Sequence, residues 1–159
     1  WRLYLRRRVE NYVYTYDYRA RPVTPDSYLG PLPDWLQPIA QKLQTENLFP
    51  RLPDQVIVNE YLPGQGIAPH IDCEPCFDDT IASLTLGSAA IMQFTHPHTR
   101  ERQELYLKER SLILLSGPAR YEWQHGIPAR KSDTVEGFKI PRERRVSLTF
   151  RNVILNENG

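Results

Sequence analysis

Seven short segments between residues 55 and 153 constrain the fold more than any other feature of the chain. Each is rich in β-branched or aromatic residues, and turn-forming or charged residues separate it from the next. The segments are QVIVNEYL, TIASLTLG, AAIMQFT, QELYL, SLILLS, RYEWQH and RRVSLTFRNV. Short strands at this spacing predict a mainly β fold of the sandwich or jelly-roll kind. We expect one long strand-free connection, at residues 128–143.

The first 54 residues have a different pattern. RRVENYVYTYDY (7–18) alternates and predicts a strand, and a proline-rich loop follows at 19–33. DWLQPIAQKLQTENL (34–48) predicts a helix that Asp34 can cap. Its apolar stripe would contain Trp35, Leu36, Ile39, Ala40 and Leu43. We therefore expect one domain over 1–159, with an N-terminal extension, lid and helix at 1–54 and a β core at 55–153.

Composition excludes several classes of protein. Hydrophobic residues make up 40% and charged residues 25% of the chain, which is typical of a globular protein. The sequence has no apolar run long enough for a membrane span, and its arginine-rich start is unlike a signal peptide. The first residue is not Met, so we expect a trimmed fragment. Two cysteines are too few for a disulfide scaffold, and a monomeric, cytoplasmic protein is expected.

The stretch HIDCEPC (70–76) holds candidate metal ligands. Alternation places His70 and Asp72 on one face of an extended segment. His125, which ends the strand-like RYEWQ and precedes Gly126, is the best third ligand. Two histidines and one carboxylate are characteristic of non-haem Fe(II) oxygenases. The alternative is a surface hairpin with a hydrogen-bonded histidine.

Cys73 and Cys76 lie in the same stretch. A zinc site would need further ligands, for which His96 and His98 have the wrong spacing. A redox disulfide is a second alternative. We favour small, partly buried thiols without chemistry.

The last strand offers a binding site for a dianion. Alternation in RVSLTFR places Arg145, Ser147, Thr149 and Arg151 on one face. The Cα atoms of the two arginines would lie roughly 20 Å apart, and their side chains could clamp a five-carbon diacid. Asn59 and Tyr61 offer further hydrogen bonds. The alternative is two exposed arginines on an edge strand.

Together these motifs resemble the AlkB-like family of Fe(II)/2-oxoglutarate dioxygenases. The resemblance covers the chain from about Arg7 to Val153. It rests on NEYLPGQGIAPHID, SLTLGS, RSLILLSGPARYEWQHGI and RRVSLTFR, which are most similar to the branch with the tRNA wobble-uridine hydroxylase and its bacterial relatives. The resemblance implies a double-stranded β-helix.

The resemblance also implies roles for individual residues. Fe(II) would be held by His70, Asp72 and His125. Arg145 would pair with the far carboxylate of 2-oxoglutarate, and Arg151 would lie near the carboxylate that chelates iron. Asn59 and Tyr61 would form hydrogen bonds with this co-substrate. O2 is the second co-substrate, and succinate and CO2 are the products.

The implied partner is nucleic acid, either single-stranded DNA or RNA or a tRNA. The candidate substrate contacts are Glu74, Tyr16, Arg7 and Arg130. Trp123 and Tyr121 could stack on a base or simply pack, and the 19–33 loop falls where the family has its lid. Further phosphate contacts would come from Tyr4, Arg6, Arg8, Lys131, Lys139, Arg142 and Arg144.

We expect oxidative demethylation of N-methylated bases, with release of formaldehyde. Hydroxylation of a modified tRNA base is the nearest alternative. A protein side chain as substrate, or an inactive nucleic-acid-binding module, are the others.

Overall fold

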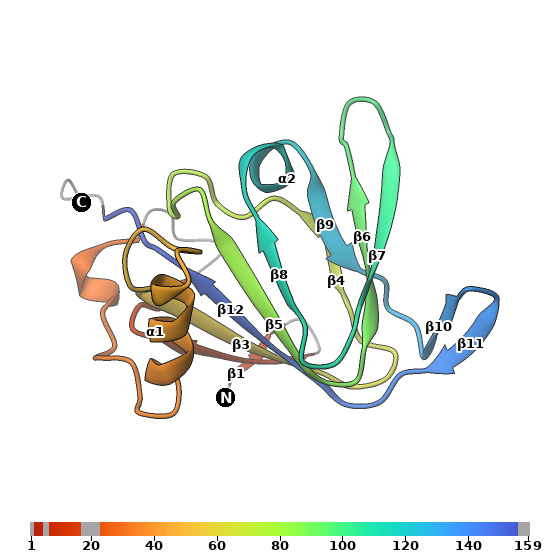
Figure 1. Ribbon diagram of the computed structural model, residues 1–159, viewed down its shortest axis with the longest axis horizontal. Coiled ribbons are helices and arrows are strands. Elements are labelled where there is room, and N and C mark those ends of the chain that lie inside the picture. Colours follow the sequence, from red (N-terminus) through yellow and green to blue (C-terminus); the bar gives the residue numbers. More distant parts are fainter. Residues whose placement is uncertain (1, 5–6, 17–22, 156–159) are drawn as a thin grey trace.

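The computed structural model describes residues 2–4, 7–16 and 23–155, and the side chains from residue 7 onward. A six-stranded and a four-stranded β-sheet form the body of the protein, beside a separate two-stranded hairpin, and a helix packs against the larger sheet (Figure 1). The six-stranded sheet has the order β1 (Arg2–Tyr4), β2 (Arg7–Tyr12), β3 (Gln55–Tyr61), β12 (Arg145–Arg151), β5 (Ile81–Gly87) and β8 (Leu112–Leu115). The four-stranded sheet has the order β4 (Ile67–His70), β9 (Gln124–Ile127), β6 (Ala90–Thr95) and β7 (Arg102–Leu107). The prediction of a mainly β jelly roll is confirmed.

The two central strands of the larger sheet separate core from site by simple alternation. Every second residue of β12 (Val146, Leu148, Phe150) packs into the main hydrophobic cluster, together with Val56 and Val58 of β3. The residues between them face a pocket that both sheets line. These residues are Arg145, Ser147, Thr149 and Arg151 of β12 with Ile57, Asn59 and Tyr61 of β3. One strand pair therefore forms the core on one face and a polar pocket on the other.

Helix α1 (Gln37–Thr45) covers the core face of the larger sheet (Figure 1). Leu36, Ala40 and Leu43 are buried there, as the apolar spacing predicts. The predicted cap was wrong, because the turn before the helix continues to Leu36, the N-cap, which provides no side-chain bond. Asp34 is exposed.

Three predicted strands or loops differ from the structure. The strand at 7–18 ends at Tyr12, because Val13 has a φ of 69°, and Tyr18 lies outside the described residues. The RYEWQH segment divides into helix α2 (Gly117–Tyr121), which has proline in its first turn, and strand β9. The 19–33 loop contains a 3-10 turn, η1 (Pro25–Ser27), and its residues 19–22 lie outside the described part.

The 128–143 connection is not free of strands. It contains a hairpin of β10 (Ser132–Val135) and β11 (Phe138–Pro141), which projects from the end of the sheets in Figure 1. Its two turn residues, Glu136 and Gly137, have φ values of 50° and 83°. Two consecutive positive φ values are typical of a tight hairpin turn. The glycine was the available signal for this turn.

Truncation of a buried phenylalanine tests the placement of the core. Phe150→Ala should lower the free energy of unfolding by about 3–5 kcal/mol, because the side chain is fully buried among α1 and the larger sheet. Phe138→Ala is the matched control, since Phe138 is 74% exposed and its loss should change stability by less than about 0.5 kcal/mol. Urea denaturation measures both, and equal losses would contradict the placement.

Candidate active site

Three potential metal ligands meet between the two sheets. His70 ends β4 and lies directly opposite His125 of β9, whereas Asp72 follows β4 in the connection to β5. Asp72 Oδ1 lies 3.3 Å from His70 Nε2 and 3.6 Å from His125 Nε2. Ligand atoms of all three residues lie within 4.8 Å of one another. The structure thus brings together the predicted triad, with both histidines presenting Nε2 to one point.

The proton positions suit metal binding. His70 Nδ1 lies 2.8 Å from the carbonyl oxygen of Ala68, which can only accept, so Nδ1 can donate there and Nε2 is the nitrogen directed toward Asp72 and a metal. Burial lowers the pKa of His125 to about 4, against the opposing effect of the Asp72 carboxylate. A neutral imidazole is the form that coordinates a metal.

The charge of Asp72 depends on a buried ion pair. Burial by itself would raise the pKa of the carboxyl, but the Arg151 guanidinium and the hydrogen bond from His70 outweigh it and hold the pKa far below its ordinary value. Arg151 Nη1 donates to Asp72 Oδ2 at 2.7 Å, and Nε donates to Gln55 Oε1 at 2.8 Å. The guanidinium also lies 3.9 Å from the ring centroid of Phe77. Asp72 is therefore an anion with a fixed orientation.

The other end of β12 holds a second buried cation. Arg145 Nη2 donates to Thr85 Oγ1 at 2.8 Å, and its guanidinium lies 5.5 Å from the ring centroid of Tyr61. Burial lowers the pKa of Arg145, but the ordinary value is so high that the side chain stays charged.

Both arginines have donors without a partner. Among the described residues, four buried side-chain atoms make no hydrogen bond, and three of them are Arg145 Nε, Arg145 Nη1 and Arg151 Nη2. Such atoms are costly unless a ligand satisfies them. They belong to side chains that line the same pocket as the triad. A short dicarboxylate with one end near the triad and the other at Arg145 fits this arrangement.

Asn59 and Tyr61 line that pocket as predicted. Asn59 Oδ1 accepts a hydrogen bond from Arg7 Nε at 3.1 Å, which leaves its amide nitrogen as the group that can face a ligand. Their hydrogen bonds to a co-substrate stay a prediction.

Two residues predicted to contact the substrate are buried. Tyr16 packs edge-on against Phe77, with ring centroids 5.1 Å apart, so it belongs to the core, and its stacking on a base stays a prediction. Arg7 is also buried, and its bond to Asn59 directs it toward the pocket wall rather than to a phosphate in solvent. The alternating pattern placed both residues on a strand but could not show which face was covered.

The basic 128–143 segment is partly neutralised. Asp133 accepts a two-pronged pair from buried Arg142, with bonds of 2.6 and 2.8 Å, so the prediction that Arg142 contacts phosphate was wrong. Arg130 Nε donates to the same carboxylate at 2.7 Å, but the side chain is half-buried and its role stays a prediction. The predicted roles of four exposed residues also stay predictions. These residues are Glu74, Lys131, Lys139 and Arg144.

The remaining residues predicted to contact nucleic acid lie in different surroundings. Arg8 is exposed and pairs with Glu60 at 3.6 Å. Tyr121 lies under the Arg120 guanidinium, and Trp123 makes an edge contact with His96 at 5.4 Å between centroids. The side chain of Tyr4 and the whole of Arg6 lie outside the described part.

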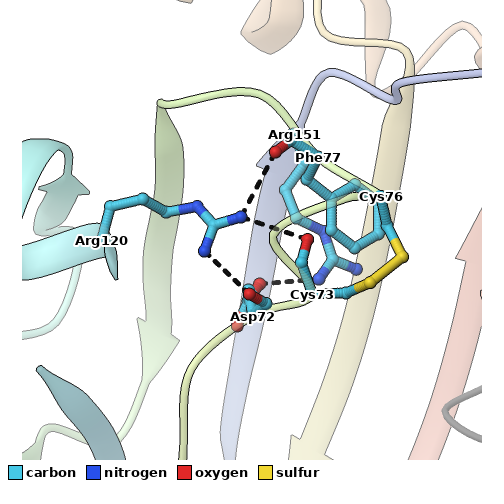
Figure 2. The surroundings of a disulfide bond; sticks show 6 residues. All are labelled: Asp72, Cys73, Cys76, Phe77, Arg120 and Arg151. Carbon is cyan, nitrogen blue, oxygen red and sulfur yellow. Dashed lines mark hydrogen bonds and ion pairs between the residues drawn. A yellow bond between two sulfur atoms is a disulfide. The ribbon is translucent and has the colours of Figure 1, made fainter. Parts of the chain in front are cut away.

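Cys73 and Cys76 form a disulfide, so the prediction of inert thiols was wrong (Figure 2). Both cysteines are buried beside Phe77 in a small cluster behind Asp72. The cross-link closes the turn that directly follows this ligand.

A cytoplasmic location stays a prediction. No helix in the described part is long and apolar enough to cross a membrane.

Several residues of the site were not identified from the sequence. Gln55 and Thr85 hold the two arginines, Phe77 stacks on Arg151, and Arg120 contacts the backbone at Asp72. Strand register could have found Gln55, which pairs directly opposite Arg151. The other three depend on tertiary packing and left no pattern in the sequence.

A model of the 2OG-Fe(II) oxygenase superfamily matches residues 4–151. The chain therefore belongs to this superfamily, and its relatives are members of the AlkB family. Its fold is that of OsALKBH1, with a TM-score of 0.66 and 20% identity over 91% of this chain and 77% of that chain. The predicted family, fold and dioxygenase class are confirmed, and Fe(II), 2-oxoglutarate and O2 are the cofactor and co-substrates of this family.

Two relatives are 41% identical to the chain. One is the "Uncharacterized protein L905" of Acanthamoeba polyphaga mimivirus, where the match covers 87% of this chain and 68% of that protein. The other is the mouse "tRNA (carboxymethyluridine(34)-5-O)-methyltransferase ALKBH8", where it covers 92% of this chain but only 24% of that protein. The zebrafish "Probable RNA/DNA demethylase ALKBH6" is 30% identical, over 77% of this chain and 63% of that protein. The chain thus spans about a quarter of the mouse relative.

Removal of the Arg145 guanidinium tests the dicarboxylate clamp. Arg145→Met should weaken 2-oxoglutarate binding about 100-fold, because two charge-assisted hydrogen bonds of about 1.5 kcal/mol each are lost. Metal affinity without 2-oxoglutarate should not change, since Arg145 does not contact the triad. Calorimetric titration measures both, with exposed Arg102→Met as the control. An unchanged 2-oxoglutarate affinity would refute the clamp.

The disulfide gives a second prediction. The double variant Cys73→Ala, Cys76→Ala should lose about 2 kcal/mol of unfolding free energy, the loop-entropy contribution of so short a cross-link. Wild-type protein treated with a dithiol should lose a similar amount. Metal affinity should be retained, because the triad contacts are independent of the sulfurs. Chemical denaturation and metal titration check the two statements, and loss of metal binding would count against the second.

Proposed function

We propose that this AlkB-family oxygenase oxidises a C–H bond on a modified base of nucleic acid, with a tRNA base as the first candidate. The observation that carries the oxygenase assignment is the pair of partly unsatisfied buried arginines beside the triad. Together they specify a metal with a dicarboxylate next to it, which few other functions require. The nucleic-acid substrate is supported by the relatives.

Each group in the pocket has a definite task. His70, Asp72 and His125 would hold Fe(II), which activates O2 when it is bound together with 2-oxoglutarate. Arg145, with Asn59 and Tyr61, would orient the co-substrate from its far end. Arg151 keeps the Asp72 carboxylate ionised, and its remaining donor, Nη2, would be available to the near carboxylate of the co-substrate. The largely buried triad limits the access of water to the reacting centre.

The names of the relatives favour RNA. The mouse protein with 41% identity is a methyltransferase of carboxymethyluridine at position 34 of tRNA, and a domain like this chain is one part of it. An oxygenase domain in such a protein suggests a substrate in the same tRNA. Hydroxylation of the side-chain carbon of a carboxymethylated uridine is our first candidate reaction.

Oxidative N-demethylation is the second candidate. The zebrafish relative is a "Probable RNA/DNA demethylase", and the Arabidopsis thaliana relative, 38% identical over 93% of this chain, is an "Alkylated DNA repair protein ALKBH8 homolog". The same C–H oxidation on an N-methyl group gives a product that releases formaldehyde. The triad and clamp serve both reactions equally.

Nucleoside mass spectrometry separates the two candidates. The protein would be incubated with Fe(II), ascorbate, 2-oxoglutarate and O2 and one of two substrates. The first is an anticodon stem-loop with carboxymethyluridine at position 34. The second is a single-stranded oligonucleotide with 1-methyladenine and 3-methylcytosine. A gain of one oxygen on the uridine would establish hydroxylation, whereas loss of methyl with formaldehyde would establish demethylation.

The control is Asp72→Ala, which removes one metal ligand and should abolish either product. Succinate formation without any change in either nucleic acid would leave the oxygenase intact and contradict both substrates. A product that persists in the Asp72→Ala protein would contradict the site itself.

A further inference from the structure

Arg120 is a charged side chain buried deep in the protein outside the pocket that the proposed function uses. It is 2% exposed and is the largest of the fully buried side chains among the described residues. We propose that Arg120 is a positioning residue that fixes the backbone at Asp72 and thereby sets the spacing between Asp72 and His125. The inference rests on the proposed metal site.

The partners of Arg120 are backbone carbonyl oxygens. Nη1 donates to the oxygen of Asp72 at 2.8 Å, and Nη2 donates to those of Cys73 and Phe77 at 3.2 and 3.3 Å (Figure 2). Nε donates to the oxygen of Asp78 at 3.4 Å. These four carbonyls belong to the connection between β4 and β5, which lies outside the named strands and is paired only at an isolated bridge between Phe77 and Val153. Buried carbonyls need donors, and one guanidinium reaches all four, although the oxygen of Cys73 also accepts from the backbone N–H of Cys76.

This use of a cation is costly unless its bonds are needed. Burial lowers the pKa of Arg120, since desolvation disfavours the charged form. No hydrogen bond to a carboxylate is seen for this side chain within the described residues. The four carbonyl dipoles therefore replace water, while the charge of the nearby Asp72 carboxylate opposes the effect of burial. This is favourable only while the connection keeps this one conformation.

Arg120 also links two ligand-bearing segments. It belongs to α2, which is followed within four residues by His125 on β9. Its bonds run to the backbone of Asp72, which comes from a different part of the chain. Asp72 is thus held twice, with its carboxylate bound by Arg151 of β12 and its carbonyl bound by Arg120 of α2. The second contact relates Asp72 directly to the segment that carries His125.

The disulfide cannot replace this link. It joins Cys73 to Cys76 within the same connection and makes no tie to α2 or β9. Loss of the disulfide loosens a turn, whereas loss of Arg120 separates two ligand-bearing segments. Metal affinity should therefore respond to Arg120 and not to the sulfurs.

The test measures metal binding without catalysis. Apoprotein would be titrated with Mn(II) alone, and free Mn(II) would be followed by electron paramagnetic resonance at a temperature where every variant is folded by circular dichroism. Arg120→Met should weaken Mn(II) binding at least tenfold. Arg120→Lys keeps the charge with fewer donors in a different geometry, so its affinity should lie between those of Arg120→Met and wild type. The Arg120→Lys variant also provides the test if the Arg120→Met variant does not fold.

The matched controls are exposed Arg102→Met and the double variant Cys73→Ala, Cys76→Ala, both with wild-type affinity. A lower melting temperature of the Arg120 variants with unchanged Mn(II) affinity would show a merely structural role and overturn the proposal. Failure of the wild-type protein to bind Mn(II) would instead refute the metal site, and the proposal with it. The two failures are therefore distinguishable.

Discussion

The buried ion pair between Asp72 and Arg151 supports the rest of the site. Neither charge could be buried alone, because an unpaired ion loses its hydration without compensation. At 2.7 Å the pair ties the irregular connection after β4 to the central strand β12. It also keeps Asp72 ionised beside His125, whose pKa burial lowers, and a divalent metal requires a carboxylate and a neutral imidazole. The fold and the chemistry of the metal centre thus depend on the same contact.

Arg145, the second buried arginine of β12, has fewer partners than its donors require. Arg145 has a bond to Thr85 and a ring contact with Tyr61, but two of its buried donors have no partner. In the protein without co-substrate, the two unsatisfied donors lower stability. The larger core, formed by the other face of the same strand, compensates for this loss. A bound dicarboxylate would satisfy those donors and so stabilise the folded state by mass action. Stability and co-substrate binding are therefore coupled through one β-strand.

Much of this arrangement could be predicted from the sequence, for a physical reason. Alternation in RVSLTFR determines which face each side chain takes, so the sequence alone places Arg145 and Arg151 on the same face of one strand. His70 and Asp72 followed from the same rule. Arg120 could not, because a strand-like reading of RYEWQ hid the short helix, and its partners are carbonyls, which every residue has. The hairpin at 132–141 was missed because its strands have only four residues each and include Asp133 and Pro141, which are uncommon in strands.

The buried and exposed parts of the site have different consequences for specificity. The triad, both arginines and the residues that hold them are mostly buried, and their geometry suits any substrate with an accessible C–H bond. Tyr16 and Arg7, expected at the substrate, belong to this buried frame instead. Glu74 and the lysines of the 128–143 segment remain exposed. Under the proposed function, discrimination between a tRNA side chain and an N-methylated base would therefore come from exposed residues around the pocket, whose identity can change without disturbing the oxidation chemistry.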